Sequence, residues 1–329
     1  MDLQEFLTEW HNDSTTVLVH TSGSTGEPKP MRVEKRRMEA SARTTCDFLG
    51  LRHGDTALLC MSLDYIAGKM MAVRSLVRGL RLVVVEPDGH PLATVTDHID
   101  FAAMVPMQVW NSLQVPEQRE RLMNIRHLII GGGAIDDGLA EELRMFPNAV
   151  WSTYGMTETL SHIALRRLSG PDATDWYTPF EGVGLSLTAD GCLVINTPAL
   201  HDGPLTTNDI AELVSDGRFK ILGRKDNIIC SGGLKIQAEE VERLLRPHIR
   251  VPYIITKRRD EKFGEVVVLL TEGDTSTAKT ICQHVLSKYW QPRAYVHVDR
   301  IPLTPTGKPA RKQAEELVLF IDKAQFPSR

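Results

Sequence analysis

Short apolar runs recur at nearly regular intervals through the first half of this 329-residue chain. Ala57–Met61 is one such run, and an unbroken apolar run is typical of a strand buried on both faces. Between the runs, apolar residues have helical spacing, as in Tyr65–Val77, and Gly79 stands where a helix C-cap would lie. Strands that alternate with helices indicate an α/β fold with a mainly parallel sheet. Further strands are predicted at Leu82–Val85, Phe101–Val105, Leu128–Ile130 and Ala149–Ser152, and further helices at Glu34–Leu49 and Ile135–Met145.

The pattern changes after about Ser169, where Gly, Pro, Asp and Thr separate short strands. A small, mostly β subdomain is expected there, with strands at Cys192–Ile195, Ile210–Val214 and Phe219–Leu222. A polar break follows at Gly223–Asp226, and beyond it the chain has an α+β pattern, with helices predicted at Ala238–Leu245 and Ala278–Tyr289 and strands at Tyr253–Thr256, Val266–Leu270 and Tyr295–Val298. The predicted organisation is therefore a large domain over residues 1–222, a hinge at 223–226 and a small C-terminal domain over 227–329.

Composition excludes several classes of protein. The formal net charge of −4 gives no basic field for nucleic acid, and no apolar run approaches the roughly 20 residues that span a bilayer. The N-terminus lacks the apolar core of a signal peptide. Five scattered cysteines without C-x-x-C spacing indicate reduced thiols and no zinc site, so a cytoplasmic location is predicted.

Thr21–Lys29 is a loop of small and hydroxylated residues that follows a β-branched run at Thr15–Val19. Such a loop can offer backbone N–H groups, hydroxyls and the charge of Lys29 to a phosphate chain. Clusters of this composition are more often plain solvent loops. The segment is not a Walker A motif, since two residues separate Gly26 from Lys29 and no Ser or Thr follows the lysine.

Ser152–Thr159 has the sequence STYGMTET and comes directly after a predicted strand. It is therefore expected at the carboxyl edge of the sheet, where ligands bind in α/β folds. Tyr154 can stack on a purine, Thr157 can bond phosphate, and Glu158 can hold Mg²⁺, which prefers oxygen ligands. The alternative is an ordinary loop in which Thr157 or Thr159 caps a helix.

Two later segments carry further polar groups. Asp209 lies at a strand edge and can accept bonds from ribose hydroxyls, with Arg224 from the polar break as a second contact. Near the C-terminus, Pro302–Lys308 forms a stiff turn that presents a lysine. Charged turns and a solvated lysine are the plainer interpretations.

In order and spacing, these four segments resemble those of the adenylate-forming superfamily, which includes acyl- and aryl-CoA ligases, luciferase and peptide-synthetase adenylation domains. The resemblance covers nearly the whole chain. It implies a layered α/β domain with a β subdomain, followed by a mobile C-terminal domain. It also implies an AMP-forming acid–thiol ligase that uses ATP, Mg²⁺ and coenzyme A.

The resemblance assigns roles to individual residues. Thr157 and Glu158 look like the α-phosphate and Mg²⁺ ligands, and Lys308 looks like the lysine that bridges the acid carboxylate and the α-phosphate. Asp226 resembles the hinge residue. The glycines of 232–233, with Lys235, resemble the face that lines a pantetheine tunnel. The implied nucleotide-binding residues are Thr21, Ser22, Gly23, Ser24, Thr25, Gly26, Lys29, Gly132, Gly133, Ala134, Tyr154, Gly155, Asp209 and Arg224.

The chain departs from the superfamily pattern in length, because only about 20 residues precede the phosphate loop where relatives carry well over one hundred. A reduced N-terminal subdomain is therefore expected. The short N-terminal region, together with the Ser62–Gly68 segment, most resembles bacterial o-succinylbenzoate–CoA ligases of menaquinone biosynthesis. Tyr65 and Arg74 are then candidates for the acid pocket, Arg74 for a second carboxylate. An arginine solvated on the helix surface is the alternative.

Other functions remain open at this point. One alternative is the activation of another aryl or medium-chain acid, and a second is the loading of an acyl group onto a carrier-protein thiol. A nucleotide-binding regulator without catalysis is disfavoured, since Lys29, Glu158, Asp226 and Lys308 are all present. The expected partners are small molecules, with no nucleic acid and no membrane span, and the sequence leaves open whether the chain is a homodimer.

Overall fold

The computed structural model describes residues 1–20, 30–133, 135, 137–303 and 309–325. By the clustering of its contacts the chain divides into two units, and each is described by itself. Unit 1 comprises Met1–Ser186, Val194–Leu205 and Leu213–Lys220, and unit 2 comprises Leu187–Leu193, Thr206–Glu212 and Ile221–Arg329.

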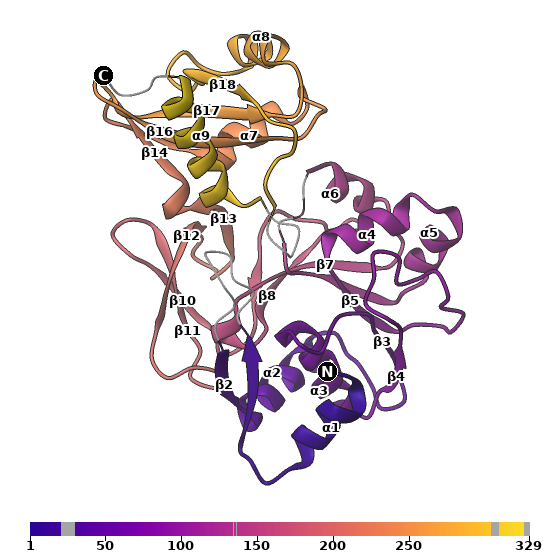
Figure 1. Cartoon of the computed structure of the whole chain (residues 1–329). Helices are drawn as coiled ribbons and strands as arrows, with labels where there is room; N and C mark the ends of the chain where they lie inside the picture. Colours follow the sequence, from indigo (N-terminus) through magenta and orange to yellow (C-terminus); the bar gives the residue numbers. More distant parts are fainter. Residues whose placement is uncertain (21–29, 134, 136, 304–308, 326–329) are drawn as a thin grey trace. The chain divides into compact units, whose positions relative to one another are not determined.

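Unit 1 is built on a seven-stranded sheet in the order β4-β3-β5-β6-β7-β8-β9 (Figure 1). The pairs from β4 to β7 are parallel, whereas β8 and β9 are antiparallel to their neighbours. The parallel strands end at one edge of the sheet. The bounds are β3 (Thr56–Leu59), β4 (Arg81–Val84), β5 (Phe101–Met104), β6 (His127–Ile130), β7 (Ala149–Gly155), β8 (His162–Arg167) and β9 (Thr178–Pro179).

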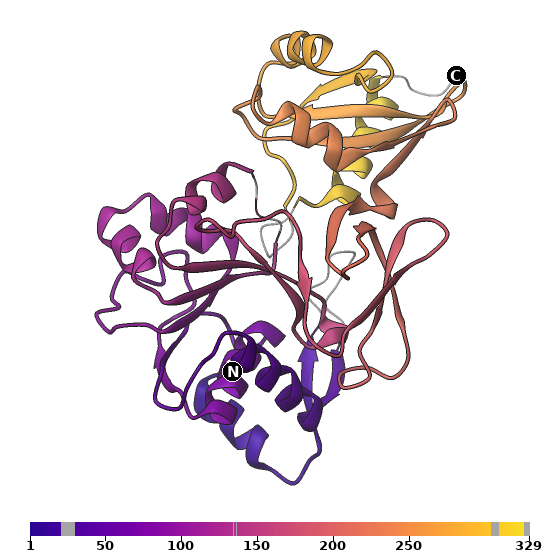
Figure 2. The ribbon, with the colours of Figure 1, turned by 180° about the vertical axis from the view of Figure 1, so that it is seen from behind.

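Helices cover both faces of this sheet, as its apolar strands require. Leu58, Ala102 and Leu128 point to one face and pack with side chains of α4, α5 and α6 in a single buried cluster. Their chain neighbours point to the opposite face, on which α2 and α3 lie (Figure 2). The helices are α2 (Lys35–Phe48), α3 (Ile66–Arg78), α4 (Pro106–Leu113), α5 (Pro116–Met123) and α6 (Asp137–Arg144).

The N-terminal segment packs onto α3. Helix α1 (Leu3–His11) begins with a capping box between Asp2 and Glu5. Lys69 of α3 is 2% exposed, and its ammonium lies 3.5 Å from the Glu9 carboxylate of α1. Strands β1 (Thr16–His20) and β2 (Pro30–Glu34) then form an antiparallel pair in which His20 lies opposite Pro30.

A second sheet has the order β10-β11-β12-β13, and the boundary between the two units runs through its strands. This sheet contains the three strands predicted for a β subdomain. Its bounds are β10 (Gly184–Leu187), β11 (Cys192–Asn196), β12 (Leu205–Leu213) and β13 (Phe219–Arg224).

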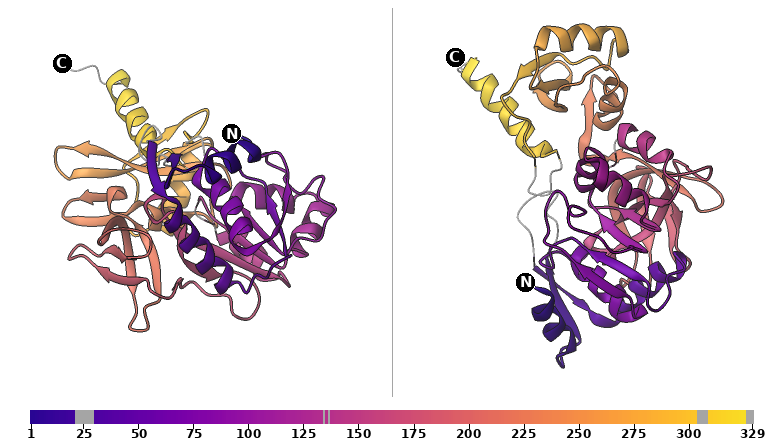
Figure 3. Two further views of the ribbon diagram at one scale, coloured as in Figure 1. Left: turned by 90° about the horizontal axis from the view of Figure 1, so that it is seen from below. Right: turned by 90° about the vertical axis from the view of Figure 1, so that its right-hand side faces the viewer.

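Unit 2 has its own sheet, ordered β15-β14-β17-β16 with β18 parallel to β17. Ile255 and Val267 pack on α7 and α8, whereas Ile254 and Val268 face α9. The two sets of helices therefore lie on opposite faces (Figure 3). The bounds are β14 (Ile228–Ser231), β15 (Leu234–Gln237), α7 (Ala238–Leu245), β16 (Tyr253–Asp260), β17 (Gly264–Thr271), α8 (Thr275–Val285), β18 (Ala294–His297) and α9 (Arg311–Gln325).

The predicted α/β class and most predicted elements are confirmed, with some corrections. Leu82–Val85 was expected as a buried strand, but β4 is an edge strand in which Val84 is 52% exposed. Helix α8 ends at Val285, before the predicted Tyr289. The elements that were not predicted include helices α4, α5 and α9 and strands β2, β8 and β10. Among the described residues no helix is both long and apolar enough to cross a membrane.

Candidate active site

The carboxyl ends of β6 and β7 lie side by side in unit 1. The parallel register pairs Ile130 with Ser152, so Gly131–Gly133 continues beside Thr153–Gly155. A Cβ built on Gly131 would lie 2.4 Å from the Thr153 hydroxyl oxygen, so the Thr153 side chain occupies the space that a side chain at position 131 would need. Two segments predicted to line a nucleotide site are thus brought together.

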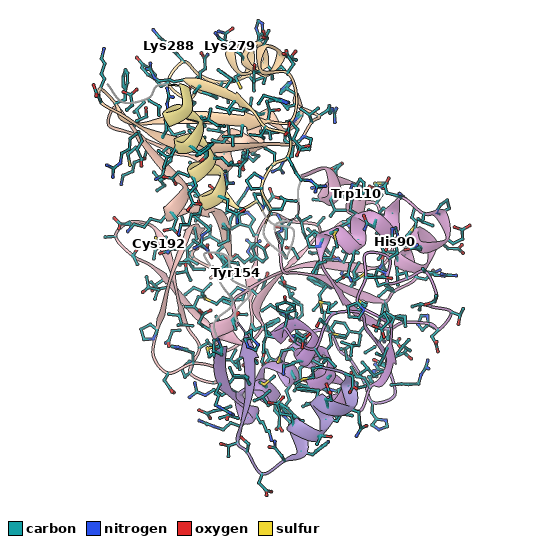
Figure 4. All side chains as sticks on the ribbon, viewed as in Figure 1. His90, Trp110, Tyr154, Cys192, Lys279 and Lys288 are labelled. Carbon is teal, nitrogen blue, oxygen red and sulfur yellow. The ribbon has the colours of Figure 1, made fainter. Side chains whose placement is uncertain are left out.

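Tyr154 lies near the end of β7 (Figure 4) and packs in an aromatic cluster. Its half-buried ring meets the ring of Phe219 edge-on, with centroids 5.1 Å apart, and lies 5.8 Å from that of Tyr177. Tyr177 and Phe219 stack at 5.4 Å. These contacts fix the position of the Tyr154 ring.

A short 3₁₀ turn, η1 (Thr157–Thr159), follows this strand. The Thr159 hydroxyl accepts from the Met156 N–H at 3.0 Å, and its single proton faces the Met156 and Ser161 carbonyls, which lie 3.0 and 2.7 Å away. Leu160 then has φ +64°, the only positive φ of a non-glycine residue in the described part of the chain. The turn is therefore rigidly held, and Thr159, not Thr157, makes the capping contacts.

The side chains of η1 include two candidates for binding Mg²⁺ and phosphate. Thr157 is 8% exposed, and the half-buried Glu158 carboxylate forms no hydrogen bond or ion pair within the described residues. The described residues contain no group of three or more His, Cys, Asp or Glu side chains that could hold a metal. One available carboxylate fits Mg²⁺ held mainly by substrate phosphates and water.

In unit 2, Arg224 lies between two carboxylates. Its guanidinium is 3.4 Å from Asp209 and 3.0 Å from Asp226, and Asn208 donates to Asp226 at 3.2 Å. Gln237 donates to the Arg224 carbonyl at 2.9 Å. The predicted ribose pair and the predicted hinge residue therefore form one ion-pair network.

The predicted pantetheine face is the turn between β14 and β15. Gly232 and Gly233 have φ +56° and +86°, a conformation that favours glycine. The Gly232 N–H donates to the Phe263 carbonyl at 2.8 Å, while Lys235 is exposed on β15. The turn is thus anchored to the β16–β17 connection.

The two acid-pocket candidates have different environments. Tyr65 precedes α3 and is 40% exposed, whereas Arg74, more than two turns further on, is 2% exposed. Arg74 is therefore not solvated, and the alternative of a surface arginine is wrong. Burial lowers the pKa of its guanidinium to about 10, so it remains charged at neutral pH.

Several predicted residues lie outside the described part of the chain. They are Thr21, Ser22, Gly23, Ser24, Thr25, Gly26, Lys29, Ala134 and Lys308.

Sequence reasoning missed the side chains that surround Tyr154 and Arg74. Tyr177 and Phe219 are distant in the chain from Tyr154, and no local pattern connects them. Ser161 and His162, which lie beside Arg74, carried a weak signal: they are polar residues that follow the STYGMTET segment after one leucine, Leu160.

The family model described as AMP-binding enzyme matches residues 4–218. The chain belongs to this family. The match covers more than half of the chain, so the predicted superfamily and the enzyme class, an AMP-forming acid–CoA ligase, are confirmed.

Relatives agree with this assignment. The 2-succinylbenzoate–CoA ligase of Bacillus velezensis is 26% identical, over 93% of this chain and 69% of that protein. An acyl-CoA synthetase (AMP-forming)/AMP-acid ligase II-like protein from Dyadobacter fermentans is 31% identical, with a TM-score of 0.65 over 96% of this chain and 93% of that chain.

Two solved structures of o-succinylbenzoate CoA synthetase from Bacillus subtilis share the fold. The complex with the acyl-adenylate intermediate is 25% identical, with a TM-score of 0.75 over 92% of this chain and 69% of that one. The complex with ATP and magnesium ion is 24% identical, with a TM-score of 0.74 over 92% and 70%. The ligands of that complex are the ATP and Mg²⁺ predicted for this family member.

Proposed function

We propose that this acid–CoA ligase acts on 2-succinylbenzoate, an aryl acid with a second carboxylate, and forms 2-succinylbenzoyl-CoA for menaquinone biosynthesis. One observation carries the proposal. Arg74 is a buried cation, and among the described residues only the Cys46 thiol adds to burial as an influence on its pKa. No described carboxylate forms an ion pair with it.

A buried charge without a counter-ion destabilises the folded state, because the protein interior solvates an ion less well than water does. An anionic substrate group would supply the missing charge, and a charge-assisted bond from guanidinium to carboxylate is geometrically well matched. Acids without a second carboxylate would leave Arg74 unpaired. The names of the relatives agree with a dicarboxylate of this kind.

In the first half-reaction, the acid carboxylate attacks the α-phosphorus of ATP, the bond to pyrophosphate breaks, and an acyl-AMP forms. Tyr154 would stack on the adenine, Asp209 and Arg224 would hold the ribose, and Thr157 would bond the α-phosphate. Glu158 would hold Mg²⁺, which offsets phosphate charge when bound. Lys308 would bridge the two reacting anions, a positioning and electrostatic role.

In the second half-reaction, the thiol of coenzyme A attacks the acyl carbon and AMP leaves, while the thiol proton passes to solvent. The Gly232–Gly233 turn and Lys235 would line the path of the pantetheine arm. A thin arm can pass close to the backbone where no side chain projects. We place the hinge at Asp226, between a large domain over 1–222 and a small domain over 227–329.

Acid-dependent exchange of pyrophosphate into ATP tests which acid is the substrate. The exchange is measured with 2-succinylbenzoate and with aryl and medium-chain monoacids. Exchange with 2-succinylbenzoate together with thioester product supports the proposal. Exchange without thioester indicates loading of a carrier protein, and stronger exchange with a monoacid indicates a different acid. The absence of exchange with every acid would identify a nucleotide-binding regulator.

The roles of Lys308 and the hinge need a separate measurement. Lys308→Ala should abolish acyl-AMP formation and leave thioester formation from supplied acyl-AMP largely intact. Equal loss of both half-reactions would contradict a lysine that serves only the first.

A further inference from the structure

A continuous line of hydrogen bonds starts at Arg74 in unit 1, part-buried at Ser161 and buried at Thr45. Arg74 donates from Nη2 to the Ser161 hydroxyl at 2.5 Å, and that hydroxyl lies 3.1 Å from Nδ1 of His162. On the other side of the ring, Nε2 of His162 lies 3.1 Å from the Thr45 hydroxyl, which donates to the Ser41 carbonyl at 3.1 Å. The line connects α3, β8 and α2.

Donor capacity gives this line a direction. A guanidinium only donates, so Ser161 accepts from Arg74 and its own proton is free for His162. At the other end, the Thr45 hydroxyl donates its proton to a carbonyl and must accept from the ring. His162 is therefore neutral, with its proton on Nε2, in agreement with a pKa that burial and the Arg74 charge hold well below the ordinary value.

We infer that Ser161, His162 and Thr45 form a relay that positions the Arg74 guanidinium for the second carboxylate of the acid. His162 and Thr45 lie one and two hydrogen bonds beyond Ser161, so both act on Arg74 through Ser161. The inference rests on the proposed function, because it requires a dicarboxylate substrate.

The relay also connects the acid group to the nucleotide segment. The Ser161 carbonyl accepts from the Thr159 hydroxyl at 2.7 Å, within the turn that carries Thr157 and Glu158. One residue thus fixes Arg74 through its side chain and η1 through its backbone. A fixed separation between these two sites suits a substrate that is held at both of its carboxylates.

Three substitutions at increasing distance from Arg74 test the relay: Ser161→Ala, His162→Leu and Thr45→Val. The KM for 2-succinylbenzoate should rise about 10-fold or more for Ser161→Ala, because this variant loses the hydrogen bond that holds the charged guanidinium. It should rise less for His162→Leu and least for Thr45→Val, because these variants act on Arg74 only through Ser161. The KM for ATP should change less than about twofold. His162→Asn, whose amide oxygen can accept from Ser161, should recover part of the loss.

Ser75→Ala is the matched control, since Ser75 is also buried, lies beside Arg74 on α3 and donates only to the Met71 carbonyl. A merely structural role of the relay would change KM values for the diacid, for a monoacid and for ATP alike. That result, or an equal effect of Ser75→Ala, would overturn the inference.

A second readout does not depend on the acid. The ¹⁵N shifts of His162, assigned with His162→Asn, should report the Nε2–H tautomer in the wild type and a mixture of tautomers in Arg74→Met. A Nδ1–H tautomer in the wild type would refute the relay. If the Nε2–H tautomer is found but 2-succinylbenzoate supports no exchange, the choice of acid fails while the hydrogen-bond line stands.

Discussion

A Cβ built on Gly155 lies 2.2 Å from the backbone carbonyl oxygen of Ser161. The two backbones therefore touch where β7 leads through η1 into β8, and no side chain fits between them. The clash would be with main chain, which cannot move aside as the end of a flexible side chain can.

Gly155→Ala should lower the free energy of unfolding by about 3 kcal/mol or more, because the overpacking must displace the η1 backbone. Pyrophosphate exchange should fall with it. Gly184→Ala is the control, since a Cβ there makes only ordinary contacts with Asn196, at 3.6 Å and beyond. Chemical denaturation measures both variants, and a Gly155→Ala protein as stable as Gly184→Ala would contradict the close approach.

Arg74→Met should raise the free energy of unfolding by about 1–3 kcal/mol, since an apolar side chain of similar length replaces a buried, unpaired charge. The same change should raise the KM for 2-succinylbenzoate far more than that for a monoacid. Arg78→Met, one turn further along α3, is the control, because Arg78 pairs with Asp47 and is partly exposed. Loss of stability in Arg74→Met would argue for a structural arginine.

Tyr154→Leu should raise the KM for ATP about 10-fold, because stacking of a base on an aromatic ring contributes roughly 1–3 kcal/mol. Tyr154→Phe keeps the ring and its contacts with Phe219 and should stay within about twofold of the wild type. Tyr289→Leu, at a residue 68% exposed in unit 2, serves as the control. An equal KM for ATP in all three variants would show that the Tyr154 ring does not bind the nucleotide.

Thiol reagents should modify one cysteine of the native protein quickly. Cys230 is exposed, whereas Cys46, Cys60, Cys192 and Cys282 are buried. Burial also raises the pKa of the Cys60 thiol to about 12 and that of Cys282 to about 11, which suppresses the reactive thiolate. Alkylation at pH 8 followed by peptide mapping measures this, and Cys230→Ser should abolish the fast phase.

Stability should fall in mild acid because of His162. The unfolded chain binds a proton at this residue as the pH drops below about 6.5, while the folded chain does not. The free energy of unfolding should therefore decrease by up to about 1.4 kcal/mol per pH unit below 6.5. His162→Asn should flatten this slope, and His98→Asn, at an exposed histidine, should not.

Local patterns were sufficient for most of unit 1. The unbroken apolar run at Ala57–Met61 predicted a strand covered on both faces, and β3 is fully buried. Gly79 was expected at a helix end, and it caps α3 with φ +67°. The similar run at Leu82–Val85 wrongly predicted a buried strand, whereas β4 lies at the edge of the sheet. The order of the strands decides which of them lies at an edge, and a local apolar run does not contain that order.

The environment of the site required the tertiary structure. Sequence alone left Arg74 either in a pocket or in solvent, since one arginine in a helix fits both. The partners that decide it, Ser161 and His162, lie almost ninety residues further along the chain. Tyr154, Tyr177 and Phe219 likewise come from three segments far apart in the chain and meet only in the folded protein.

The unpaired charge of Arg74 also has an evolutionary consequence. Most substitutions of Arg74 by an uncharged residue would stabilise the fold. Mutation should therefore remove the arginine quickly in any lineage in which selection no longer maintains activity on the dicarboxylate. Descendants of this chain that change their substrate should lose Arg74 first and keep His162 and Thr45 for some time as uncharged core residues. The order in which these residues disappear from a lineage would then record when the preference for a dicarboxylate was given up.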